Sequence, residues 1–219
     1  MISFEGGFRP RRLLAIGAHS DDIEIGCGGT ILRLVREGEN IDVFWVVFGS
    51  TEGRAREAFE SAAYFLRGAR KKKVVVKDFR DGFFPFHGIE IKEFFEQIKA
   101  AYSPDLVLTH YRDDRHQDHR LISDLTWNTF RDHLILEYEV PKYDGDLGIP
   151  NFFVPLDESV CRRKIRYILR SYKSQKGKHW FTEDTFFSLM RIRGIESCSP
   201  GRYAEAFYCR KVVMRGQGG

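Results

Sequence analysis

The chain has 219 residues, of which 42% are hydrophobic and 30% are charged, a composition typical of a globular protein with one substantial core. The formal net charge of +4 is small, which argues against a surface for nucleic acid. No apolar run approaches the roughly 20 residues that span a bilayer, and residues 1–10 lack the apolar core of a signal peptide. We therefore expect one domain over residues 1–219, no membrane span and, because the four cysteines show no C-x-x-C spacing, a reducing cytoplasmic location.

The first predicted element is a strand over residues 13–16, whose sequence LLAI lacks polar alternation, as in a strand buried on both faces of a parallel sheet. The strand stops at a polar loop with one imidazole and three carboxylates, from His19, Asp21, Asp22 and Glu24. Three glycines over residues 26–29 then lead into an apolar-periodic segment from Ile31, which predicts a helix. Ligands of open α/β sheets bind beyond the carboxyl ends of the strands, so we expect chemistry in this loop.

The residues of this loop argue against a phosphate cradle, because its carboxylates would repel a pyrophosphate and the G-x-G-x-x-G spacing is absent. His19 and Asp22, three residues apart in a turn, can instead present a nitrogen and an oxygen to one point. That pairing suits zinc or another first-row divalent metal. An Asp cap on the following helix beside a hydrogen-bonded histidine explains the same residues equally well, so this loop alone leaves both interpretations open.

Further apolar runs predict strands over residues 41–48, 74–76 and 105–109, and apolar periodicity predicts helices over residues 55–66 and 89–102. The three lysines at 71–73 are expected to form a solvated turn, and residues 79–87 an aromatic-rich loop. Strands that alternate with helices at about 30-residue spacing favour a doubly wound sheet. The predicted fold class is therefore α/β, a Rossmann-like three-layer sandwich around a mostly parallel sheet, with the active site at the carboxyl ends of the strands.

The predicted fourth strand also ends in a polar cluster, residues 110–119, with the sequence HYRDDRHQDH. Because the carboxyl ends of parallel strands open onto the same edge, this cluster can meet the first one. His119 then becomes a natural third ligand beside His19 and Asp22, with His116 and Asp118 next to it. Three protein ligands with an open fourth position are typical of a catalytic zinc site, so the two clusters together favour a metal centre.

The rest of the chain carries weaker signals. Residues 134–138 are expected to add a strand, residues 143–150 to form a surface loop, residues 160–172 to form an amphipathic helix and residues 203–213 to form a last strand.

With both clusters in view, the sequence resembles the PIG-L/LmbE-like family of zinc-dependent N-acetylglucosaminyl deacetylases over nearly its whole length. The family signature A-H-P-D-D is met by AHSDD at residues 18–22, and H-x-D-H is met by HQDH at residues 116–119. Further similar stretches are Arg54 with Glu57, Ser174 with Gln175, and YAEAF at residues 203–207. Ser20 replaces the usual proline, which loosens the loop backbone but removes no ligand.

The resemblance implies a metal held by His19, Asp22 and His119, with Zn²⁺ as the expected ion and another first-row metal such as Fe²⁺ as the alternative. It implies that Asp21 acts as general base on a zinc-bound water. It also implies that His116 supports the oxyanion or protonates the departing amine. The implied reaction is hydrolysis of an acetyl group from an N-acetylated amino sugar of the N-acetylglucosamine type, either free or linked to a nucleotide or lipid.

Three other residues receive roles, Asp118 and Arg54 from their chemistry and positions and Gln175 from the resemblance. Asp118 is expected to orient His116, although a cap on the helix that follows is nearly as good an interpretation. Arg54 is expected to bind a polar or anionic part of the substrate, and a surface salt bridge to Glu57 is the competing interpretation. Gln175 is expected to contact the substrate, and family resemblance also leads us to expect a homo-oligomer.

Two alternatives use the same metal ligands. A non-haem iron oxygenase also has two histidines and one carboxylate, and hydrolysis under anaerobic conditions would exclude it. A non-catalytic sugar-binding protein with a structural metal would leave Asp21 without a task, so it predicts that Asp21→Asn keeps the physiological function.

Overall fold

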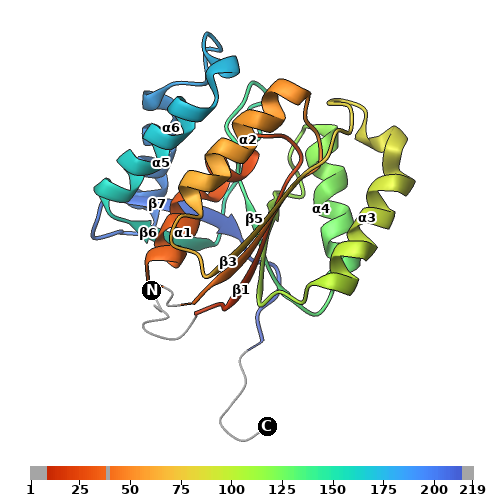
Figure 1. Ribbon diagram of the computed structural model, residues 1–219. Coiled ribbons are helices and arrows are strands. Elements are labelled where there is room, and N and C mark those ends of the chain that lie inside the picture. Colours follow the sequence, from red (N-terminus) through yellow and green to blue (C-terminus); the bar gives the residue numbers. More distant parts are fainter. Residues whose placement is uncertain (1–8, 38–39, 214–219) are drawn as a thin grey trace, which may run out of the picture.

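The computed structural model describes residues 9–37 and 40–213, so residues 1–8, which bear on the expected lack of a signal peptide, lie outside the described part. Its strands are β1 (Arg12–Gly17), β2 (Asp42–Val47), β3 (Lys71–Val76), β4 (Leu106–His110), β5 (Leu134–Tyr138), β6 (Phe152–Leu156) and β7 (Tyr203–Tyr208). They form one seven-stranded sheet in the order β3-β2-β1-β4-β5-β7-β6 (Figure 1). Strands β1 to β5 pair in parallel, and β7 pairs antiparallel with β5 and β6. The predicted mostly parallel sheet is confirmed.

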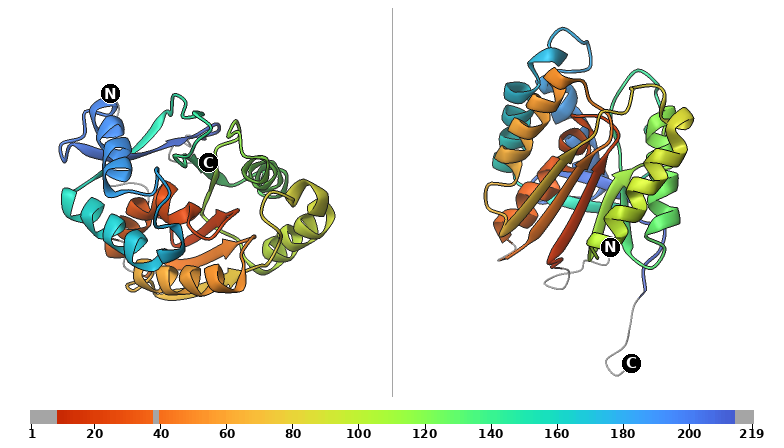
Figure 2. Two further views of the ribbon diagram at one scale, coloured as in Figure 1. Left: turned by 90° about the horizontal axis from the view of Figure 1, so that it is seen from above. Right: turned by 45° about the vertical axis from the view of Figure 1, so that its right-hand side comes forward.

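The helices are α1 (Asp22–Glu37), α2 (Glu52–Phe65), α3 (Gly88–Ala101), α4 (Gln117–Thr129), α5 (Glu158–Ser171) and α6 (Glu183–Glu196), with two short 3-10 turns, η1 (Phe84–His87) and η2 (Lys173–Gln175). Helices α1, α2, α5 and α6 cover one face of the sheet, and α3 and α4 cover the other (Figure 2). This arrangement confirms the predicted three-layer α/β sandwich. Within the described residues, no helix is both long enough and apolar enough to cross a bilayer.

Strand β1 lies in the interior of the sheet, between β2 and β4, and its side chains are apolar on both faces. Leu13 and Ala15 pack into the core beneath α1 and α5, whereas Leu14 and Ile16 pack into the core beneath α3 and α4. Burial of one such leucine contributes about 1.5–3 kcal/mol. Two cores thus hold β1 in place, and its carboxyl end at Gly17 becomes a rigid base for the polar loop that follows.

Helix α1 begins earlier than the sequence predicts. It begins at Asp22, so the segment expected to be a loop up to Gly29 is already helical. A Cβ on Gly26 would lie 2.1 Å from Cδ2 of Tyr138, and one on Gly28 would lie 2.6 Å from Cε1 of Phe65. These glycines allow close packing of helix against sheet rather than a turn, which is why the loop prediction is wrong.

Helix α1 is also interrupted at Cys27, where the backbone is non-helical with φ −141° and ψ 16°. Such a break leaves backbone groups without their helical partners. The Glu205 carboxylate of β7 accepts two amide hydrogens after the break, at 2.7 and 2.6 Å, and the ammonium of Lys164 donates to the Ile25 carbonyl at 2.7 Å. Lys164 and Glu205 are buried and also pair with each other at 2.6 Å.

We expect Glu205→Ala to lower the free energy of unfolding by about 3–5 kcal/mol, because it leaves the buried Lys164 charge without its partner. Urea unfolding of the variant and the wild type measures this difference. The double replacement Lys164→Met with Glu205→Leu should cost less than the single one, since it removes both charges. Glu90→Ala, at an exposed position, is the matched control, and a cost below about 1 kcal/mol for Glu205→Ala would contradict the assignment.

Other predicted boundaries need correction. The lysines at 71–73 are not a turn but the first half of β3, where their backbone pairs with β2 and their side chains are exposed at the edge of the sheet. Edge strands tolerate lysine because pairing uses only the backbone. The last predicted strand ends at Tyr208 rather than at residue 213, whereas the strand over residues 134–138 is confirmed at both ends. Strand β6 and helix α6 were not predicted, because Pro155 interrupts one pattern and α6 is apolar on several sides.

Candidate metal centre

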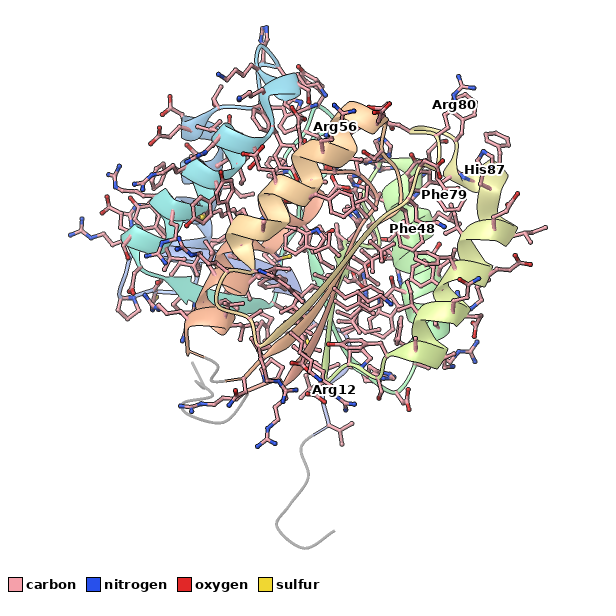
Figure 3. All side chains as sticks on the ribbon, in the orientation of Figure 1. Arg12, Phe48, Arg56, Phe79, Arg80 and His87 are labelled. Atoms are coloured by element: carbon pink, nitrogen blue, oxygen red, sulfur yellow. The ribbon has the colours of Figure 1, made fainter. Side chains whose placement is uncertain are left out.

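The two polar clusters meet where β1 and β4 end. These strands are direct parallel neighbours, so the loops that follow them open at the same edge of the sheet (Figure 1). Arg56 of α2 and Arg80 of the loop after β3 lie at this end of the molecule, whereas Arg12, at the start of β1, lies at the opposite end (Figure 3). The site therefore lies at the carboxyl ends of the strands, as the fold class predicts.

Three ligand-capable atoms from the two clusters converge. Nδ1 of His19 lies 3.2 Å from Nε2 of His119 and 3.4 Å from Oδ2 of Asp22. Nε2 of His119 lies 3.5 Å from the same Asp22 oxygen. A tetrahedral zinc with bonds of about 2.0–2.1 Å would hold its ligand atoms about 3.3 Å apart. The spacing of the three atoms therefore fits a divalent metal.

The opposite nitrogen of each of these histidines faces a carboxylate. Nε2 of His19 lies 3.1 Å from Oδ2 of Asp118, and Nδ1 of His119 lies 2.9 Å from Oδ2 of Asp114. Carboxylates in this position orient a metal-binding imidazole and set which nitrogen is free for the metal. Here they leave Nδ1 of His19 and Nε2 of His119 free to face Asp22.

The electrostatics of two of the three side chains, His119 and Asp22, suit a cation directly. Burial, helped by the neighbouring His110, lowers the pKa of His119 to about 4, so this imidazole is neutral at pH 7. Burial alone would raise the pKa of Asp22, but the surrounding histidines hold it well below its usual value. Burial likewise opposes protonation of His19, but the carboxylates around it raise its pKa well above the ordinary value. A metal binds a neutral imidazole and an ionised carboxylate, so His119 and Asp22 already have the required forms, whereas His19 must release its proton when a metal binds.

His110, the last residue of β4, is a member of the site to which the sequence assigned no role. Its Nε2 accepts the amide hydrogen of Ala18 at 2.9 Å and lies 3.2 Å from Oδ2 of Asp22. Its ring stacks on His119 with centroids 3.9 Å apart. Asp22, His110 and His119 thus form one of three groups of ligand-capable side chains within the described part of the chain. The other two are His19 with His116 and His119, and His19 with Asp81, His116 and Asp118. The sequence feature that could have identified His110 as a site residue is its position at the end of a buried strand.

The loop after β3 reaches over the same site, and it brings Asp81, to which the sequence assigned no role. Oδ1 of Asp81 lies 3.1 Å from Nε2 of His19. The amides of Gly82 and Phe84 donate to the two oxygens of Asp118 at 2.6 and 3.1 Å. Gly82 has a φ of +80°, a left-handed conformation that favours glycine. Asp118 therefore joins this loop to the imidazole of His19.

His116 and Asp118 are close, but not in the arrangement that the sequence predicts. The carboxylate of Asp118 faces His19, and it is the backbone amide of Asp118 that donates to Nδ1 of His116, at 3.3 Å. His116, not Asp118, is the cap of helix α4. Because Nδ1 accepts this hydrogen bond, Nε2 of neutral His116 carries the proton, and burial together with His19 lowers the pKa of His116 and favours the neutral form.

Asp21 lies beside the three converging side chains and is paired with Arg54. An Arg54 guanidinium nitrogen donates to Oδ1 of Asp21 at 2.8 Å, and Asp21 is buried. Burial raises the pKa of Asp21, while the charge of Arg54 opposes that rise. Glu57 accepts two hydrogen bonds from Ser174 at 2.9 and 2.6 Å, so the competing salt bridge between Arg54 and Glu57 is not what the structure contains.

Gln175 is buried in η2, directly after Ser174, which is hydrogen-bonded to Glu57. Its Nε2 donates to Oγ of Ser174 at 3.1 Å, and its Oε1 has no hydrogen-bond partner among the described residues. Nε of Arg54 is likewise buried without such a partner. Buried polar atoms are usually hydrogen-bonded, so these two have unused hydrogen-bonding capacity in the part of the chain that the structure describes.

Comparison with known proteins places this arrangement in a family. Residues 14–130 match the profile of the PIG-L family, described as GlcNAc-PI de-N-acetylase. The fold resembles that of N,N'-diacetylchitobiose deacetylase from Pyrococcus horikoshii, with 21% identity, a TM-score of 0.70, and coverage of 90% of this chain and 83% of the other.

Two further solved structures share the fold. A zinc-inhibited form of teicoplanin deacetylase has 16% identity and a TM-score of 0.66, with coverage of 95% of this chain and 100% of the other. The 4-carboxy-2-hydroxymuconate hydratase of Pseudomonas putida has 15% identity and a TM-score of 0.68, with the same two coverages. The fold is thus shared by deacetylases and a hydratase, and residues rather than fold must decide the reaction. With the family profile covering more than half of its length, the chain belongs to the PIG-L family.

Proposed function

We propose that the protein, as one domain over residues 1–219, is a metal-dependent hydrolase that removes the acetyl group from an N-acetylated amino sugar. The observation that supports this most strongly is the convergence of His19, Asp22 and His119 within 3.5 Å beside a carboxylate that is not one of the three. Metal-assisted amide hydrolysis needs three ligands that leave a position open and a separate base. Asp21, next to Asp22 and held by Arg54, can be that base.

A bound zinc would lower the pKa of a water to about 7 and polarise the amide carbonyl. The side chains of the site could not do either without a metal. The other tasks belong to side chains. Asp21 takes the proton from the attacking water, and Arg54 keeps its carboxylate ionised and in place. His116, with a proton on Nε2, donates a hydrogen bond to the oxygen that becomes negative as the amide is attacked, and the departing amine receives the proton that Asp21 accepted from the water.

The substrate class rests on the relatives. The family description names a GlcNAc-PI de-N-acetylase, and one structural neighbour is named for N,N'-diacetylchitobiose. We therefore propose an N-acetylglucosamine-type substrate, free or linked to a nucleotide or lipid, with Arg54 and Gln175 as substrate contacts. Zn²⁺ is the proposed metal, with Fe²⁺ as the alternative.

Acetate release by the purified, zinc-loaded protein tests this proposal. The panel contains N-acetylglucosamine that is free, nucleotide-linked, lipid-linked or inositol-linked, and the assay runs under anaerobic conditions to exclude an oxygenase. We expect release from at least one compound, loss of release with a chelator and recovery on addition of zinc. Stoichiometric zinc without acetate from any compound would contradict deacetylation and favour the non-catalytic sugar-binding alternative.

We expect Arg54→Met to move the acidic limb of the pH profile of kcat/KM to higher pH. The base must be ionised to accept a proton, and loss of the guanidinium removes the charge that opposes the raised pKa of Asp21. The rate at low pH then falls more than the rate at high pH. Arg54→Lys keeps a cation and should retain most of the wild-type limb, and an unshifted limb in Arg54→Met would show that Arg54 does not act on the base.

A further inference from the structure

Asp114 is a buried carboxylate that contacts both histidines of the H-x-D-H segment. Its Oδ2 lies 2.9 Å from Nδ1 of His119, and its Oδ1 accepts the backbone amide hydrogen of His116 at 2.7 Å. The side chain is only 3% exposed. One carboxylate thus sets the orientation of a proposed metal ligand, His119, and the backbone position of His116, the proposed hydrogen-bond donor to the oxyanion.

A lysine from a different part of the chain neutralises this carboxylate. Lys142 belongs to the loop between β5 and β6, and its Nζ lies 3.0 Å from Oδ2 of Asp114 and 2.5 Å from Oδ2 of Asp146. Its side chain is only 10% exposed. Asp146 also accepts the backbone amide hydrogen of Arg115 at 2.7 Å, so the ammonium is held between two buried carboxylates.

The same oxygen of Asp114 therefore faces both an imidazole and an ammonium. A carboxylate behind a metal-binding histidine makes that histidine a stronger donor to the metal. A cation on the carboxylate has the opposite effect, because it reduces the negative charge that the imidazole N–H experiences, and at low exposure this effect is weakly screened.

We propose that Lys142 is a positioning residue that weakens, through Asp114, the donation of His119 to the metal. A metal with a weaker donor is a stronger Lewis acid, and it binds less tightly than the bare Asp114–His119 pair would allow. Lys142 thus lowers the affinity of the site for the metal and raises the ability of the bound metal to polarise the amide carbonyl. The inference rests on the proposed metal site, but it concerns a residue that touches neither metal nor substrate.

The sign of the effect on zinc affinity tests this role. Competition with a chelator measures the zinc Kd of the whole protein for each variant. We expect Lys142→Met and Lys142→Gln to bind zinc roughly three to ten times more tightly than the wild type. Asp114→Asn should bind zinc about 10–100 times more weakly, as is usual when the partner of a ligand histidine is lost. Lys142→Arg keeps the cation and should retain the wild-type affinity.

The double variant separates an effect through Asp114 from the direct effect of one charge on another. In the Asp114→Asn background, Lys142→Met should give no further tightening. Lys92→Met, which removes an ammonium that is paired with Glu96 on α3, is the matched control and should leave the affinity unchanged. The visible spectrum of the cobalt-substituted protein should change in Lys142→Met and stay as in the wild type in Lys92→Met.

The outcomes are distinct. Weaker or unchanged zinc binding in Lys142→Met and Lys142→Gln, in variants with a wild-type thermal transition, would overturn the inference and leave Lys142 a structural residue. Equal tightening in both backgrounds would overturn the route through Asp114. A wild-type protein that binds no zinc would instead overturn the proposed metal site itself.

Discussion

Asp21→Asn should retain stoichiometric zinc and lose acetate release by roughly 10²–10⁴-fold in kcat, the usual contribution of a positioned general base. The three converging atoms come from His19, Asp22 and His119, so removing the Asp21 charge takes away no ligand. Asparagine has nearly the shape of aspartate and can still accept a hydrogen bond from Arg54, but it cannot take a proton. Asp21→Ala should show the same separation of metal content from turnover.

Zinc content and kcat, measured on the same preparation, check this prediction. Asp113→Asn is the matched control, since Asp113 is an exposed carboxylate of the second cluster that pairs with Arg210 and is not one of the three converging side chains. Near-wild-type turnover in Asp21→Asn would show that the base is wrongly assigned. Retained physiological function together with absent hydrolysis would support the sugar-binding alternative.

His119→Ala should lose metal and activity together. It removes one of three proposed ligands. The fall in zinc affinity should therefore exceed the loss of about 10–100-fold that is typical when a residue hydrogen-bonded to a ligand is removed. The fold should persist, because Asp114 keeps its contact with Lys142 and helix α4 keeps its cap at His116. Far-ultraviolet circular dichroism, zinc content after dialysis and acetate release measure the three properties.

His133→Ala is the matched control for this variant. His133 precedes β5 at the opposite end of the sheet, where its ring packs against Phe130. It should keep both zinc and turnover. If His119→Ala retained zinc at the wild-type affinity, the ligand set would be wrong, and the group of His19, Asp81, His116 and Asp118, which does not contain His119, would have to be examined in its place.

Much of this site could be predicted because its signals are local or topological. His19 and Asp22 lie within one turn, so their spacing alone brings them together. His119 is 100 residues away, but it follows a strand that pairs in parallel with β1, and parallel neighbours end at the same edge. Apolar runs likewise identified β1, β2 and β4, because strands buried on both faces leave no other pattern.

Other features depend on contacts that no local pattern records. The glycines of α1 have the composition of a loop, and only the rings of Tyr138 and Phe65 packed against them explain why they lie in a helix. The lysines of β3 look like a turn until their backbone is paired with β2. In both cases the partner is distant in sequence and outweighs the local preference.

The amino-acid sequence by itself was sufficient for the fold class, the sheet edge that carries the site and the three converging side chains, since these follow from strand order and from spacing within a turn. The tertiary structure alone decided how the remaining polar groups pair. Asp118 faces His19 rather than His116, and Lys142 reaches Asp114 from the loop after β5. Hydrogen-bond direction depends on side-chain rotamers and on distances of about 3 Å between elements, which strand order does not specify.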